Sequence, residues 1–157
     1  NEMAADSTNI IVHGISMGAA TTMMVSGDSL PENVRCFVED CGYTSVYDEF
    51  KGELKNQFGL PAFPLMPCTS ALNKLLNGWS FAEASALEQV KKCKRPMLFI
   101  HGDSDTFVPT YMVKDVYEAK PEPKELWITK GVEHDMSYET YPEEYTAKIK
   151  AFCKKYM

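Results

Sequence analysis

The chain has 157 residues, of which 45% are hydrophobic, and a formal net charge of −6. A chain of about this length can form one domain and bury roughly 68–70% of its unfolded surface. The acidic balance argues against nucleic-acid binding, which needs a clustered basic face. No apolar run approaches the roughly 18 residues of a membrane-spanning helix, so we expect no membrane span in these residues.

Strand and helix patterns alternate along the chain. The expected strands are residues 9–13, 34–38, 96–100 and 125–129. The expected helices are residues 17–26, 44–58, 69–76, 80–92, 110–119 and 142–155. Thr44 or Ser45 can cap the second helix, and Gly27 suits the end of the first. This alternation predicts an α/β fold with a mostly parallel sheet flanked by helices.

One apolar segment interrupts the alternation. Residues 59–67 hold three prolines among large apolar residues, and they lie between two predicted helices. We therefore expect a bend there, and a helical insertion over residues 44–78 that covers the site like a lid. In the alternative interpretation, its apolar side chains simply pack on the sheet.

The five cysteines form an odd set without CxxC spacing: Cys36, Cys41, Cys68, Cys93 and Cys153. A disulfide scaffold or a zinc site is not indicated. Free thiols favour a reducing compartment such as the cytoplasm. Nothing near Cys41 in the sequence would activate it as a nucleophile, and we expect no metal ligands.

The pentapeptide Gly14-Ile15-Ser16-Met17-Gly18 follows the apolar strand at residues 9–13. A strand, a sharp turn that carries one serine, and a helix form a nucleophile elbow. We expect glycine at both flanking positions because larger side chains would collide there. Taken alone, G-x-S-x-G is a weak signal, since glycine and serine also build ordinary turns.

Acidic and imidazole candidates follow two later strands. Residues 101–105 read HGDSD, and residues 130–135 read KGVEHD. The carboxyl ends of parallel strands meet at one edge of a sheet, where sites assemble. The chain order serine, aspartate, histidine is the order of α/β-hydrolases, and differs from the chymotrypsin and subtilisin orders.

Together these motifs resemble the C-terminal half of a bacterial α/β-hydrolase of the esterase or peptidase type. The matching segments are HGISMG, EDCGYTS, HGDSDTFVP and GVEHDMSY, at residues 13–18, 39–45, 101–109 and 131–138. The resemblance implies a truncated α/β-hydrolase fold that lacks its N-terminal strands, with residues 1–157 as the C-terminal part of one domain. Only residues 1–8 precede the elbow strand and the first residue is not methionine, so we expect a piece of a longer chain.

The resemblance also implies roles for particular residues. Ser16 would be the nucleophile, His134 the general base and Asp105 the acid that orients the imidazole. Asp103 is the alternative acid and otherwise a turn-capping residue. The backbone N–H of Met17 would line the oxyanion hole, and the absent half would supply a second donor.

Three other polar side chains receive structural interpretations. His13 and His101 each end a strand, where a polar group can satisfy loop backbone. Asp135 cannot easily fold back onto its neighbour's ring, and we expect it to be solvated.

The predicted activity is hydrolysis of a small carboxylic ester through an acyl-enzyme on Ser16, without a metal or an organic cofactor. The apolar insertion suits an acyl or alkyl group, and a peptide or a thioester is the alternative substrate. Loss of one oxyanion donor typically costs about 10²–10³ in turnover. A further alternative is therefore an inert fragment that self-associates through the unpaired edge of the strand at residues 9–13.

Overall fold

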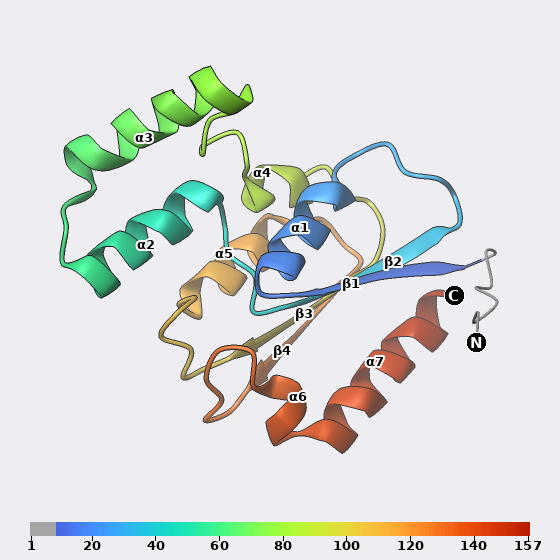
Figure 1. The fold of residues 1–157 in the computed structure, drawn as a ribbon. Coiled ribbons are helices and arrows are strands. Elements are labelled where there is room, and N and C mark those ends of the chain that lie inside the picture. The colour runs from blue at the N-terminus through green and yellow to red at the C-terminus, as the bar shows by residue number, and fades with distance from the viewer. Residues whose placement is uncertain (1–8) are drawn as a thin grey trace, which may run out of the picture.

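The structure, a computed structural model, describes residues 9–157. Four strands form one parallel sheet in the order β1-β2-β3-β4 (Figure 1). The strands are β1 (Ile10–Ile15), β2 (Val34–Asp40), β3 (Met97–Gly102) and β4 (Lys124–Thr129). A four-stranded parallel sheet flanked by helices confirms the predicted fold class.

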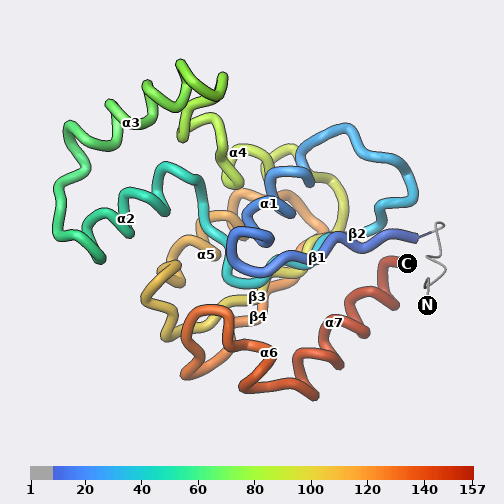
Figure 2. The backbone as a smooth tube through the Cα atoms, viewed as in Figure 1, coloured from blue at the N-terminus to red at the C-terminus, as the bar shows by residue number. Residues whose placement is uncertain are grey.

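The helices cover both faces of the sheet (Figure 2). Their bounds are α1 (Met17–Ser26), α2 (Val46–Phe58), α3 (Ala62–Asn77), α4 (Ala86–Val90), α5 (Tyr111–Ala119), α6 (Ser137–Thr140) and α7 (Pro142–Tyr156). Met23 of α1, Val90 of α4 and Val116 of α5 share one buried cluster with the sheet. Tyr145 and Phe152 of α7 form a second cluster with the opposite face. The core is thus two apolar layers separated by the strands.

Position in the sheet determines how far each strand is buried. Every residue of β3 is buried, whereas β1 and β4 keep partly exposed side chains. Within residues 9–157, β1 pairs only with β2, so its other edge has no neighbouring strand. Ile10 and Ile15 are each 40% exposed. The predicted self-association through this edge remains a prediction.

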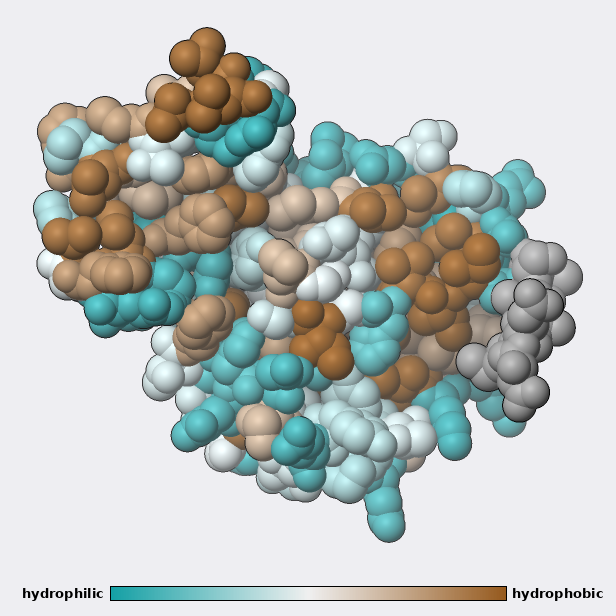
Figure 3. Space-filling model, viewed as in Figure 1, coloured by the Kyte–Doolittle hydropathy of each residue, from teal (hydrophilic) through white to brown (hydrophobic). Residues whose placement is uncertain are grey.

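Helices α2 and α3 project away from the sheet as a pair (Figure 1). Ser45 caps α2 by accepting a hydrogen bond from the Asp48 N–H, as predicted for one of two candidate residues. Much of the surface of α3 is apolar, and Figure 3 shows this hydrophobic surface on the projecting segment. Its exposed large side chains include Phe63, Leu72, Leu75 and Leu76.

The prediction that α3 starts at residue 69 is wrong, because the helix includes most of the proline-rich stretch. Helix α3 begins at Ala62, and only Phe63 departs from helical dihedral angles (φ −98°, ψ 134°). Pro64 directly follows that residue, at a position where an N–H would have no partner within the helix. Pro67 lies inside the helix, where the missing N–H removes one backbone hydrogen bond.

The predicted helix at residues 80–92 is also wrong in length. Only α4 is helical, and turns occupy residues 81–84. Ser85 caps α4 and pairs with Ser45 in an isolated bridge. The short helix α6 was not predicted, and β1, β2 and β3 each extend two residues beyond their predicted ends.

Two expectations about composition hold in the structure. All five cysteines are free. None of the helices within residues 9–157 is both long enough and apolar enough to cross a lipid bilayer.

Gly27 ends α1 for a reason other than the predicted one. Its φ of −86° does not need glycine. A Cβ at this position would lie 2.2 Å from Gln89 Oε1 and 2.6 Å from the Gln89 carbonyl oxygen. The missing side chain therefore allows α1 to approach α4 closely.

This contact predicts opposite effects for two glycine substitutions. Gly27→Ala should lower the free energy of unfolding by about 1–3 kcal/mol because the methyl group overpacks the contact. The matched control Gly52→Ala, in α2, places its Cβ in open space. It should raise that free energy by about 0.5–1 kcal/mol. Urea denaturation measures both, and equal effects of the two substitutions would contradict the packing explanation.

Candidate active site

Ser16 occupies a strained turn between β1 and α1. Its φ of 54° and ψ of −117° are unusual for a residue with a side chain. The Ser16 N–H donates to the Asp40 carbonyl oxygen at 2.8 Å, which anchors the turn to β2. A strained serine that is held by the sheet has the geometry expected of a nucleophile elbow.

Only one of the two elbow glycines is required by crowding. A Cβ on Gly14 would lie 2.1 Å from the Gly18 carbonyl oxygen. A Cβ on Gly18 would meet no atom of the described chain within 4 Å. The predicted collision is therefore wrong at Gly18, because this position faces open space on the first turn of α1.

The structure brings Ser16, His134 and Asp105 into one hydrogen-bonded series. Ser16 Oγ lies 2.8 Å from His134 Nε2, and His134 Nδ1 lies 2.7 Å from Asp105 Oδ2. Asp105 can only accept when ionised, so Nδ1 carries the proton and Nε2 is free to accept from the hydroxyl. The three residues come from loops after β1, β3 and β4.

Asp105 is buried among donors. Its Oδ1 accepts from the N–H groups of Phe107 and Val108 at 2.9 and 2.8 Å, and its Oδ2 lies 3.3 Å from His101 Nε2. Burial raises the pKa of Asp105, but hydrogen bonds from His101, His134 and Val108 outweigh it and lower the pKa to about 2. The carboxylate therefore stays ionised beside the imidazole.

Asp103 contacts the histidine loop rather than the histidine. Its Oδ1 accepts from the Gly131 N–H at 2.6 Å, and the Ser104 N–H donates to the Val132 carbonyl oxygen at 3.0 Å. A Cβ on Gly102 would lie 2.1 Å from that same carbonyl oxygen. Asp103 thus links the ends of β3 and β4, which extends its predicted turn-capping role.

The environment of His134 favours its protonated form. Burial lowers the pKa of His134, but the hydrogen bond and the charge of Asp105 raise it by more, so the net pKa lies above the ordinary value. The Phe107 ring lies 4.9 Å from the imidazole ring, centroid to centroid. The ring is thus shielded on one side and bonded at both nitrogens.

Of the other two histidines, His101 contacts this series through Asp105 and His13 lies outside it. His101 is fully buried, and its Nε2 donates to the Val108 carbonyl oxygen at 2.8 Å, as expected of a residue that satisfies loop backbone. His13 differs from that expectation, because its Nε2 lies 3.1 Å from the Tyr145 hydroxyl and joins β1 to α7. Asp135 is exposed, as predicted.

Cys41 lies beside the series without competing with it. The ligand atoms of Cys41, Asp105 and His134 lie within 4.8 Å of one another. Burial raises the pKa of the Cys41 thiol well above its ordinary value, so the thiol is neutral. Asp105 and His134 already bind each other, and these three residues therefore form a poor metal site.

A cavity of about 430 Å³ opens beside Ser16. Its walls are Ser16, Met17, Tyr43, Glu49, Phe50, Glu53, Gln57 and Phe107. The sequence analysis missed Tyr43 and Glu49 as site residues. Glu49, Glu53 and Gln57 are spaced by four residues, which places their side chains on one face of a helix. That spacing could have revealed Glu49, whereas no such signal marks Tyr43.

A second, apolar cavity of about 480 Å³ lies between α2 and α3 and shares Phe50 and Glu53 with the first. Four apolar residues of the predicted insertion at residues 44–78 line it: Phe58, Leu60, Leu65 and Met66. Phe63 does not line it and is 79% exposed. An apolar cavity thus lies next to the cavity beside Ser16, with Phe50 and Glu53 in the walls of both.

Comparison with known proteins places this chain in a family. The sequence model of the prolyl oligopeptidase family, Peptidase_S9, matches residues 1–157. The chain belongs to this family. The chain is 31% identical to the uncharacterized protein YqkD of Bacillus subtilis (strain 168) over 141 residues, which is 90% of this chain and 46% of that protein.

Solved structures share the fold. The chain is similar to the Pyrococcus furiosus esterase Pf2001, with a TM-score of 0.70, 25% identity, and 96% of this chain and 54% of that chain covered. It is also similar to the Pyrococcus horikoshii acylaminoacyl peptidase, with a TM-score of 0.68, 19% identity, and 96% and 24% covered. The chain thus spans about half the length of the bacterial relative and of the esterase.

The His134 pKa gives a prediction for the Asp105→Asn variant. The neutral amide in this variant would lack the charge that raises the pKa of His134, so this pKa should fall relative to wild type. Titration of the histidine C2–H signals by NMR measures the change. His13, whose pKa is lowered by burial, is the internal control and should not move. An unchanged His134 pKa would contradict the assigned pairing.

Glu49 gives a prediction on stability. Burial first, and then the charge of Glu53, raises the pKa of Glu49 from 4.5 to about 7. The folded protein therefore keeps a proton that the unfolded chain releases, and wild type loses stability as the pH rises from about 4.5 to about 7. Glu49→Gln has no carboxyl group to titrate at this position, so it lacks this loss. The Tm of the variant minus the Tm of wild type should therefore increase as the pH rises over that range. Thermal denaturation at a series of pH values tests this, and a constant difference would contradict it.

Proposed function

We propose that the protein is a serine hydrolase that cleaves carboxylic esters through an acyl-enzyme on Ser16. The observation that carries this proposal is the succession of hydrogen bonds of 2.8 and 2.7 Å from Ser16 through His134 to Asp105. Such a succession lets the imidazole remove the hydroxyl proton as the oxygen attacks. The serine also borders a cavity in which an acyl group can bind.

The reaction follows from this arrangement. Ser16 Oγ bonds to the substrate carbonyl carbon while its proton passes to His134 Nε2, and the Asp105 carboxylate stabilises the imidazolium. The imidazolium then gives that proton to the departing alcohol as the ester bond breaks. Water hydrolyses the acyl-enzyme by the same proton path, which restores Ser16.

The oxyanion would bind at the start of α1. The first N–H groups of a helix have no partner within the helix and carry partial positive charge. Met17 is the first residue of α1 and borders the same cavity as Ser16, so its N–H is the proposed donor. In this fold a loop after an earlier strand supplies the second donor.

An ester is the first choice of substrate because the apolar cavity between α2 and α3 suits an acyl or alkyl chain. A peptide is the second candidate, since the family is named for oligopeptidases. A thioester would react by the same steps.

A fluorophosphonate probe tests the proposal on the full-length protein. Labelling should be lost in Ser16→Ala and slowed by about 10²-fold or more in His134→Ala, which lacks the general base. Ser29→Ala, at an exposed loop position, should label like wild type. Labelling of Ser16→Ala, or no labelling of wild type, would refute the serine-hydrolase proposal.

The same probe separates the inert-fragment alternative. Labelling of the full-length protein without labelling of residues 1–157 alone would support an inert fragment. Sedimentation of that fragment then tests association through β1, and a monomer at high concentration would count against it.

A further inference from the structure

Glu49 is a buried carboxylic acid with an unsatisfied oxygen. Glu49 is 6% exposed, and its Oε1 atom has no hydrogen-bond partner among residues 9–157. Nearly all buried polar atoms in proteins have such a partner. Glu49 is also one of the residues that line the cavity beside Ser16, where a substrate would bind.

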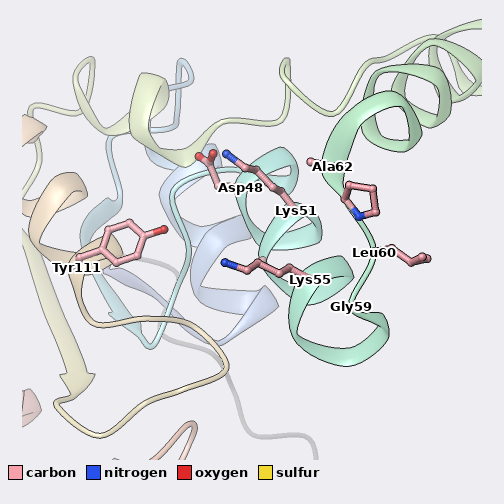
Figure 4. A pocket seen from close by; sticks show the side chains of 9 residues that line it. Asp48, Lys51, Lys55, Gly59, Leu60, Ala62 and Tyr111 are labelled. Carbon is pink, nitrogen blue, oxygen red and sulfur yellow. The ribbon is translucent and has the colours of Figure 1, made fainter.

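Within residues 9–157, protonated His134 acts on Glu49, because its positive charge lowers the pKa of the Glu49 carboxyl group. The ion pairs within residues 9–157 do not include Glu49, and no lysine or arginine lines the cavity. The nearby lysines of α2, Lys51 and Lys55, border a different cavity of about 450 Å³, in which Lys51 extends toward Asp48 and Lys55 toward Tyr111 (Figure 4). The charged walls beside Ser16 are therefore acidic.

The second acid, Glu53, accepts a side-chain hydrogen bond, whereas Oε1 of Glu49 accepts none within residues 9–157. The Gln57 side-chain amide donates to Glu53, one turn along the same helix. Burial raises the pKa of Glu49 to about 7, and the nearby charge of Glu53 adds to this effect. A cation in the cavity would stabilise both carboxylates.

Aromatic rings complete the walls. Tyr43, Phe50 and Phe107 line the same cavity as the two glutamates. Aromatic faces attract ammonium groups, and rings beside carboxylates are a recurring means of binding quaternary ammonium. The cavity therefore combines two complementary ways of binding a cationic nitrogen.

We propose that the cavity beside Ser16 is a subsite for a cationic nitrogen of the substrate, with Glu49 as its counterion. The hydrolase would then prefer esters whose acyl or alcohol part carries an ammonium group. This inference rests on the proposed serine-hydrolase function, and it adds the substrate class that the same site selects.

Isosteric ester pairs test the preference in the full-length protein. The first pair is acetylcholine and its carbon isostere, in which tert-butyl replaces trimethylammonium. The second is the 4-nitrophenyl ester of γ-trimethylammoniobutyric acid and its tert-butyl isostere. Within each pair only the charge differs, so the ratio of kcat/KM values measures recognition of the cation.

Wild type should favour the cationic member of at least one pair. Glu49→Gln should lower that ratio by about tenfold or more, because it removes the counterion. The control Glu118→Gln makes the same charge change on the exposed surface of α5, and its ratio should equal that of wild type. No preference in either pair, or an equal loss for both members in Glu49→Gln, would overturn the proposal.

Binding without turnover separates this inference from the proposed function. The Ser16→Ala variant cannot form an acyl-enzyme, so calorimetry on it measures the affinity for each ester directly. Tighter binding of the cationic member that is lost when Glu49→Gln is added supports the subsite, even if wild type hydrolyses neither ester. Equal affinities for both members refute the subsite, even if wild type hydrolyses both.

Discussion

The site depends on the close contact between the ends of β3 and β4. Asp103 accepts from the Gly131 N–H, and Gly102 has no side chain where the Val132 carbonyl oxygen approaches. These contacts fix the loop that carries His134 against the loop that carries Asp105. Parallel neighbours make this possible, because their carboxyl ends lie at one edge of the sheet. The position of the imidazole is thus a property of the strand ends.

Two carboxyl groups near the imidazole differ because their surroundings differ. Asp105 receives backbone and imidazole donors, which keep it ionised although it is buried. Glu49 is buried without such donors for Oε1, and its pKa rises instead. Burial acts in the same direction on both, so the number of donors decides the outcome. Ionisation in this site is therefore controlled by the imidazole and backbone donors that reach each carboxyl group.

The sequence was sufficient for the features that local chemistry determines. Strand patterns, the Ser16 pentapeptide and the order of serine, aspartate and histidine predicted the parallel sheet and the residues that converge. The sequence was insufficient for features that depend on contacts between elements that are distant in the chain. Helix α3 contains Pro67 in its interior, Gly27 is required by Gln89, and Gly18 faces open space. The role of Glu49 also escaped prediction, because a solvated helix face and a cavity wall share the same spacing.

The projecting α2–α3 pair has a consequence for how this protein can change over evolution. Ser16, Asp105 and His134 follow strands of the sheet, whereas α2 supplies half of the residues around the adjoining cavity. Because α2 packs mainly on α3, replacement of this pair would alter the cavity while leaving the strand ends intact. The residues of the hydrogen-bonded series and half of the adjoining cavity walls thus belong to separate parts of the fold, so the walls can vary in sequence without disturbing the strand ends.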